Sequence, residues 1–268
     1  MNSVTRRLFW LGAFLGAFCL VTQHAFAKPV PNRKMSAGLA EIDITPPVGY
    51  RLAGYFEERV STGIHDPLKA KALVLQQGNQ KIALVFCDLV GLSLEVSTNA
   101  RAQISALYGI PVSGVSIFAT HSHTGPLFND VLAAYFHHDA MVHFHRDVHE
   151  KIDYPAQLIE RLVKVVGEAN ARLAPSDLWC GITQQEGIPY NRRSKMKDNT
   201  VKTNPGQLNP NILAPAATVD HDVGMVMVSH GNFDLLGGLT IFAMHADTAG
   251  GDGVQCGLSV LYRTNHAQ

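Results

Sequence analysis

Two short histidine-bearing segments carry the residues best suited to chemistry. In the first, residues 118–126, a single residue separates His121 from His123, and a Gly-Pro pair follows. The second, residues 239–245, is an apolar run that ends on His245. Imidazole nitrogens are good ligands for Zn²⁺, which lowers the pKa of a bound water to about 7. The sequence therefore predicts a metal site to which both segments contribute.

The elements before the first segment predict where it lies. Residues 70–76 and 81–87 are strand-like runs around a turn, which is typical of a hairpin. Residues 94–108 predict a helix whose apolar face is Val96, Ala100, Ile104 and Leu107. Residues 115–119 predict a short buried strand. Strand, helix and strand in this order predict a parallel crossover, with ligands at the carboxyl ends of the strands.

Each histidine also has a structural interpretation. His121 and His123 point the same way if the backbone stays extended, but both are also compatible with loop histidines bonded to the backbone. His245, taken alone, is more typical of a structural residue. Two strand ends that each deliver a histidine to a sheet edge favour a metal site over either alternative.

The rest of the sequence has no internal repeat. It predicts several further helices, strands and loops. The expected elements are a helix at 154–173, strands at 178–183, 224–229 and 239–244, a long functional loop or short helices at 127–150, and a polar loop over the site at 191–215.

Four other features have two interpretations each. Asp88 is either a hydrogen-bond partner of a metal-binding histidine or a helix cap. Arg192 either steadies an oxyanion or is an exposed arginine. His65 lines the same edge or, the better interpretation, forms a hydrogen-bonded turn. The dense histidines at 137–149 bind metal or, more typically, form a solvated loop or cleft wall.

The charge balance limits the classes of binding partner, and the N-terminal segment indicates the compartment. The 268 residues carry 22 basic and 22 acidic side chains, which argues against a nucleic-acid partner. Residues 1–27 have the charged, apolar and small-residue order of a secretory signal, of the general or the twin-arginine type. The sequence predicts an exported protein, periplasmic or secreted, with no transmembrane segment after removal of the signal.

A series of motifs then resembles one family. The motifs, in chain order, are AGLAEIDITP at 37–46, GIHD at 63–66, HSHTGP at 121–126, NRRS at 191–194 and FAMH at 242–245. This series resembles the N-terminal catalytic domain of the neutral/alkaline non-lysosomal ceramidase family, whose own patterns read HTHSGP, NRS and FAVH. The resemblance runs from about residue 37 to residue 251.

The resemblance implies a fold, a reaction and residue roles. The implied fold is α/β, with mixed β-sheets flanked by helices in a layered α/β/β/α-type catalytic domain. The implied activity is a Zn²⁺-dependent amidohydrolase that cleaves the N-acyl bond of a ceramide or a similar lipid-like N-acyl amide. His121 and His245 then resemble zinc ligands. His123 resembles a group that binds the substrate or transition state, and Arg192 a contact near the oxyanion.

The end of the chain departs from this pattern. In the resembled family a Glu and a Tyr that bind zinc, and a catalytic Ser, follow the FAVH strand, whereas only 23 of the 268 residues follow His245 here. A one-nucleotide shift of a suitable coding sequence turns residues 253–268 into a run resembling the family. We therefore expect a signal at 1–27 and a partial catalytic domain at 28–251 that is incomplete at its C-terminus. Our hypothesis for the tail at 252–268 is that a frameshift produced it. Such a product is expected to bind metal weakly and to have little or no amidase activity.

Two further functions remain compatible with the sequence. One is an exported metallohydrolase for carboxylic or phosphate esters, and the other is a non-catalytic metal-binding remnant. Metal analysis and an amide-versus-ester substrate panel distinguish them from the amidohydrolase.

Overall fold

The computed structural model describes residues 35–206, 208–231, 234–245 and 251–255. The predicted signal at 1–27 and tail residues 256–268 lie outside these ranges. The helices are α1 (Leu94–Tyr108), α2 (Asp130–Phe144), α3 (Tyr154–Ala171) and the short η1 (Val112–Gly114). The strands are β1 (Met35–Asp43), β2 (Gly63–Ile64), β3 (Lys69–Gln77), β4 (Gln80–Cys87), β5 (Val115–Ala119), β6 (Ala174–Gln184), β7 (Arg193–Met196), β8 (Val201–Thr203), β9 (Ile212–Pro215), β10 (Asp222–His230), β11 (Asp234–Phe242) and β12 (Gly253–Val254).

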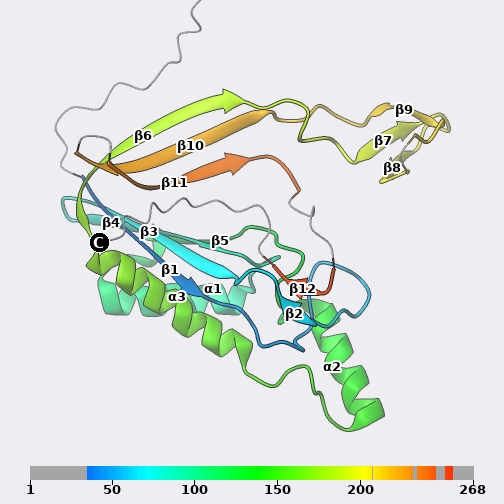
Figure 1. Ribbon diagram of the computed structural model, residues 1–268, viewed down its shortest axis with the longest axis horizontal. Coiled ribbons are helices and arrows are strands. Elements are labelled where there is room, and N and C mark those ends of the chain that lie inside the picture. Colours follow the sequence, from blue (N-terminus) through cyan, green and yellow to red (C-terminus); the bar gives the residue numbers. More distant parts are fainter. Residues whose placement is uncertain (1–34, 207, 232–233, 246–250, 256–268) are drawn as a thin grey trace, which may run out of the picture.

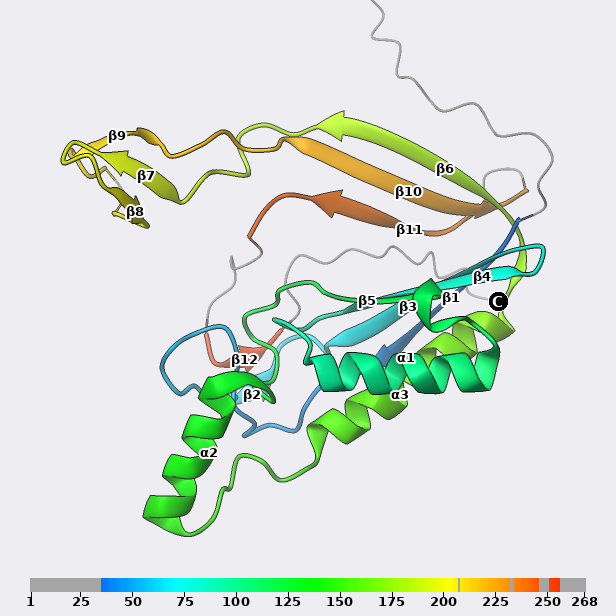
Figure 2. The same cartoon turned by 180° about the vertical axis from the view of Figure 1, so that it is seen from behind.

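One seven-stranded sheet organises the molecule, in the order β11-β10-β6-β1-β3-β4-β5. Neighbouring strands are antiparallel except β4 and β5, which are parallel and connected through α1. The centre of the sheet is its weakest junction, because β1 pairs with β6 only where residues 35–37 meet residues 174–176. At this junction the sheet turns, and the half made of β6, β10 and β11 lies over the other half (Figures 1 and 2).

Each face of the half-sheet β1-β3-β4-β5 is covered by apolar packing. Val228 of β10 packs with Ala37 and Leu73 between the two halves of the sheet. On the opposite face lie α1 and α3, whose buried residues join the main core (Figure 2). The α3 helix approaches β1 so closely that a Cβ on Gly38 would lie 2.0 Å from the carbonyl oxygen of Ala169. Helices, one half-sheet and the other half-sheet thus form successive layers, as expected of a mixed α/β fold.

The best-patterned elements form where the sequence predicts them. Helix α1 has the predicted bounds, begins after the Ser93 cap, and buries Val96, Ala100 and Ile104. The fourth residue assigned to that face, Leu107, is 63% exposed, so this part of the prediction is wrong. The hairpin of β3 and β4, strand β5 and the parallel crossover between β4 and β5 are confirmed.

Two segments predicted as loops are regular structure instead. Residues 130–144 form one helix, α2, rather than a loop or short helices. Only Ala133 and Ala140 of α2 are buried, so the helix carries no apolar stripe that a periodicity argument detects. The predicted loop at 191–215 contains β7, β8 and β9, which form a separate three-stranded sheet.

The first residues of the predicted tail are part of the fold. Strand β12 pairs in parallel with β2, and Val254 is fully buried in the main core. Gly253 packs against the His65 ring, because a Cβ there would lie 2.0 Å from that ring. His65 itself donates its backbone N–H to the Val254 carbonyl at 2.8 Å. In the part of the chain that the structure describes, no helix is long and apolar enough to cross a membrane.

Candidate metal centre

Three histidines meet where the two edges of the curled sheet come together. His121 and His123 follow β5 at one edge, and His245 follows β11 at the other. The ring centroids are 4.8 Å apart for His121 and His123, 5.1 Å for His121 and His245, and 4.7 Å for His123 and His245. One nitrogen from each ring lies within 4.8 Å of the others. The two segments singled out in the sequence therefore form one group of donors.

The His121 ring is oriented by the backbone of a neighbouring loop. Its Nδ1 lies 2.9 Å from the carbonyl oxygen of Val90. Since a carbonyl only accepts, Nδ1 carries the proton and Nε2 keeps the lone pair that a metal needs. The backbone of His121 has φ +65°, so the extended backbone that would make both histidines point the same way is not present. A left-handed residue, not strand alternation, directs this ring.

His123 is held by the loop that follows β1. A Cβ on Gly54 would lie 2.6 Å from Cγ of His123, so only glycine fits beside this ring. Tyr55 meets the same ring edge to face, with centroids 5.6 Å apart and an interplanar angle of 88°. The Arg59 guanidinium lies 4.2 Å from the Tyr55 ring centroid and donates to the Gly251 carbonyl. Nothing in the local sequence pattern indicated these three residues.

Hydrogen bonds from Thr120, Ser122 and Thr124 fix the backbone of the histidine segment 118–126. The Thr120 hydroxyl donates to the Cys87 carbonyl at 3.2 Å, and the Thr124 hydroxyl to the Gln255 carbonyl at 2.6 Å. The Ser122 amide donates to the Leu89 carbonyl at 3.1 Å. Ser122 and Thr124 are both buried. The loop is thus bound to the end of β4 on one side and to the residue after β12 on the other.

Asp88 connects strand ends beneath this loop. Its carboxylate accepts the Lys69 amide at 2.9 Å and the Thr120 hydroxyl at 3.5 Å, and lies 3.8 Å from Nζ of Lys71. Helix α1 is capped by Ser93, so the interpretation of Asp88 as its cap is wrong.

A second group of donors surrounds a buried arginine. His137, Asp147 and Glu150 also place one donor atom each within 4.8 Å of the others. Nδ1 of His137 lies 3.1 Å from both carboxylates, and the Arg51 guanidinium donates to Asp147 at 2.6 Å and to Glu150 at 3.3 Å. Arg51 is only 1% exposed, and Glu58 accepts from its Nε at 2.6 Å. A protein cation therefore already occupies this group, which joins α2 to the loop before α3.

These contacts shift the ionisation of Asp147. Burial alone would raise the pKa of the Asp147 carboxyl, but hydrogen bonds from Arg51 and the His149 amide hold that pKa below its ordinary value. Other histidines of this region bond to the backbone, as Nδ1 of His149 does with the Gly49 carbonyl at 2.9 Å.

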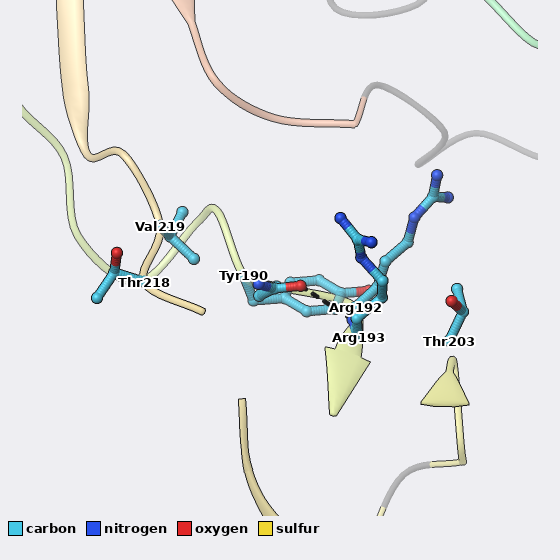
Figure 3. A pocket seen from close by; sticks show the side chains of 7 residues that line it. Tyr190, Arg192, Arg193, Thr203, Thr218 and Val219 are labelled. Carbon is cyan, nitrogen blue, oxygen red and sulfur yellow. Dashed lines mark hydrogen bonds between the residues drawn. The ribbon is translucent and has the colours of Figure 1, made fainter. Parts of the chain in front are cut away.

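Arg192 immediately precedes β7. It lines a pocket at the start of β7 whose walls include Tyr190, Thr203 and Thr218 but none of the three histidines (Figure 3). The predicted role of Arg192 near an oxyanion stays a prediction. The small sheet β7-β8-β9 extends from the far ends of β6 and β10, away from α1 and α3 (Figure 1).

The histidine group fits a zinc ion by the chemistry of its donors. Three neutral imidazoles suit Zn²⁺, Cu²⁺ or Ni²⁺, and a three-histidine set is a known catalytic zinc arrangement. The His121 ring is oriented by a hydrogen bond and the His123 ring by packing.

Comparison with known proteins supports the motif resemblance. The family described as neutral/alkaline non-lysosomal ceramidase, N-terminal, matches residues 35–250. A neutral ceramidase structure from Pseudomonas aeruginosa matches with a TM-score of 0.60 and 22% identity, covering 80% of this chain and 32% of that one. A structure of ceramidase complexed with C2 matches with a TM-score of 0.56, 22% identity and the same coverages of 80% and 32%. The chain thus spans about a third of the length of these structures, which share its fold. No curated protein sequence matches the chain.

Proposed function

Because this chain belongs to the neutral/alkaline non-lysosomal ceramidase family, we propose that it carries a zinc-dependent amidohydrolase centre for the N-acyl bond of ceramide-like lipids. The products are a sphingoid base or similar amine and a fatty acid. The observation that carries the proposal is the meeting of His121, His123 and His245 at the joined edges of the sheet. The proposed compartment is outside the cytoplasm, in line with the predicted signal.

The proposed roles come from the motif resemblance, and the surroundings of His121 and His123 are compatible with them. His121 and His245 are the proposed zinc ligands, and the bond of Nδ1 to Val90 leaves His121 a free Nε2 lone pair. When bound, Zn²⁺ supplies a Lewis acid that polarises the amide carbonyl and acidifies water.

His123 is the proposed group that faces the substrate. Gly54 and Tyr55 restrict its ring, so a hydrogen bond from it to the reacting carbonyl oxygen costs little reorganisation. Arg192 is proposed to bind a substrate oxygen from the side of the pocket at β7.

Zinc stoichiometry and substrate class test this proposal. The purified mature chain is loaded with Zn²⁺, dialysed, and analysed for metal, together with the variants His121→Ala and His245→Ala. Hydrolysis is then compared for an N-acylsphingosine, a matched carboxylic ester and a matched phosphate ester. We expect weak zinc binding that depends on both histidines, and little hydrolysis, with any turnover that is detected faster on the amide than on either ester. Zinc binding unaffected by either variant contradicts the proposed ligands, and preference for an ester contradicts the substrate class.

A further inference from the structure

Arg59 takes part in a continuous series of side-chain contacts that ends at the histidine group. The central carbon of its guanidinium lies 4.2 Å from the centroid of the Tyr55 ring. Tyr55 in turn meets the His123 ring edge to face, with ring centroids 5.6 Å apart. A single tyrosine ring therefore lies in contact with both a cation and the imidazole that is proposed to face the substrate.

The guanidinium of Arg59 is fixed by residues other than Tyr55. Its Nη2 donates to the Gly251 carbonyl, and its Nε lies 3.5 Å from the Asp252 carboxylate. The backbone of Asp252 is itself bound, because its carbonyl accepts the Thr62 amide at 2.8 Å. The Arg59 side chain is only 12% exposed, so these contacts are largely shielded from water. The cation thus has a defined position against the tyrosine ring.

The loop that carries Tyr55 is closed and bound by its backbone. The Leu52 amide donates to the Arg59 carbonyl at 2.8 Å, which closes the loop at its base. The Ala53 amide donates to the Gly125 carbonyl at 2.9 Å, which binds the loop to the histidine segment 118–126. These bonds bring Tyr55 to the histidine segment. They do not set the rotation of its ring, which depends on side-chain contacts.

A fixed ring at Tyr55 matters because of what it contacts. Both ring nitrogens of His123 are buried, and Gly54 is the residue that leaves room for this ring. A group that binds a transition state contributes most when its orientation is set beforehand, since no reorganisation is then needed during the reaction. A cation over an aromatic ring is attracted most strongly where water is excluded, so the contact of Arg59 is suited to hold Tyr55 in one orientation.

We propose that Arg59 is a positioning residue for His123 and that it acts through Tyr55. The guanidinium holds the tyrosine ring, and the tyrosine ring holds the imidazole in the orientation that faces the substrate. Arg59 itself contacts neither substrate nor metal in this proposal. The inference rests on the proposed function for what His123 does, whereas the coupling of Arg59 to His123 is measurable without any reaction.

Chemical labelling of individual histidines tests this coupling in the metal-free chain. The full chain is treated briefly with diethyl pyrocarbonate, which acylates accessible imidazole nitrogens, and each histidine is quantified by peptide mass spectrometry. His121 is exposed and serves as the reactive reference, whereas the buried nitrogens of His123 should react slowly. Arg59→Gln should raise labelling of His123 about fivefold relative to His121, the factor expected from the loss of one cation–π contact.

Arg101→Gln is the matched control for the loss of an arginine. Arg101 donates to the Val112 carbonyl at 2.8 Å, before the start of β5, whereas the histidines follow the end of that strand. This variant should leave labelling of His123 unchanged. His221, whose Nδ1 is also buried, reports general loosening of the fold in every variant.

Variants of Tyr55 test whether Arg59 acts through that ring. Tyr55→Phe keeps the ring and should keep His123 protected, whereas Tyr55→Leu should label His123 at least as fast as Arg59→Gln does. The double variant Arg59→Gln/Tyr55→Leu should match Tyr55→Leu within about twofold, because residues that act through one contact are not additive. Arg59→Lys keeps the cation and should restore part of the protection; it replaces Arg59→Gln if that variant unfolds.

Three results would overturn the inference. These are unchanged labelling of His123 in Arg59→Gln, an equal rise at His123 and His221, and additive effects in the double variant. Zinc content after loading and dialysis is measured for the unsubstituted chain and for His121→Ala and His245→Ala. The expected labelling without histidine-dependent zinc contradicts the proposed function and not the coupling, whereas histidine-dependent zinc with unchanged labelling contradicts the coupling alone.

Discussion

The rings of His121 and His245 are 5.1 Å apart, although they follow the two opposite edge strands of one seven-stranded sheet. In a flat sheet of this order, five strands would separate them. The turn between β1 and β6 brings the edges together, and packing of Val228 against Ala37 and Leu73 holds the halves face to face. The proposed metal centre is therefore a product of the sheet's curvature as much as of its histidines.

Substitution of the histidines should separate ligand from substrate roles. His121→Ala and His245→Ala should each lower zinc affinity by at least about tenfold, since each removes a proposed ligand. His123→Gln should keep most of the zinc and lose hydrolysis. His137→Ala is the matched control, because it removes a histidine from the group around Arg51. Metal analysis after dialysis checks all four variants, and a loss of zinc confined to His137→Ala would place the metal in that second group.

A methyl group at residue 54 should displace His123. In Gly54→Ala the new Cβ would lie 2.6 Å from the ring at a backbone φ of +101°. Gly49→Ala is the control, because it has the same kind of backbone strain at φ +90° and open space around it. We expect Gly54→Ala to cost about 1–3 kcal/mol more than Gly49→Ala in urea unfolding, the usual cost of overpacking. Equal costs would show that the ring moves freely and that Gly54 does not position it.

The buried Arg51 should be a large contributor to stability. Arg51→Met leaves the 3%-exposed Asp147 carboxylate without its main partner. Losing one member of a buried ion pair costs about 3–5 kcal/mol. Arg146→Met removes an exposed arginine of the same region and should change stability by less than about 0.5 kcal/mol. Chemical unfolding of the two variants measures the difference, and similar values would contradict a central role for Arg51.

The lowered pKa of Asp147 predicts acid sensitivity. A carboxyl group whose pKa is lower in the folded state stabilises that state above the unfolded pKa of about 3.9. This contribution is lost as the pH falls from there through the lower folded pKa. Asp147→Asn removes the titrating group, so its stability should fall less steeply below about pH 4. Urea unfolding between pH 3 and pH 6 gives both slopes, and identical slopes would show that Asp147 does not contribute.

Val254 should stabilise the fold even though it follows the predicted domain boundary at residue 251. Val254→Ser places a hydroxyl in the main core and should cost about 2–4 kcal/mol through lost apolar burial and an unsatisfied polar group. Ile64→Ser changes its pairing partner in β2, which is 46% exposed, and should cost less than about 1 kcal/mol. Thermal unfolding compares the two. No effect of Val254→Ser would support the interpretation of residues 252–255 as unevolved sequence.

Local patterns predicted those elements whose burial is periodic. Helices α1 and α3 each bury one stripe, and β3, β4 and β5 have compact apolar runs between turns. Strand β1 was not predicted although it is central, because close packing of α3 requires the small residues Gly38 and Ala40 rather than large apolar ones. Helix α2 and the sheet β7-β8-β9 were missed since both expose most of their side chains.

The sequence predicted which histidines belong to the candidate site, but it did not predict which other residues surround them. The three histidines were recognisable from the ends of apolar runs, and the structure brings them together. Gly54, Tyr55 and Arg59 were not, since contacts between a loop and a distant ring leave no periodic signal. The ion-pair group around Arg51 depends on residues almost 100 positions apart, as with Glu150.

Because β1 and β6 pair over only a few residues, the distance from His245 to the other two histidines depends on the angle between the two half-sheets. Residues 35–37 and 174–176 hold the junction at one end, while His245 leaves β11 at the other end (Figure 1). A nine-residue strand such as β11 is about 30 Å long, so a rotation of about 2° at the junction moves its far end by about 1 Å. A small rotation at the junction therefore becomes a larger displacement at the far end of β11. Packing changes near Ser36 or Pro175 would be magnified at the imidazoles, far from any residue that touches them.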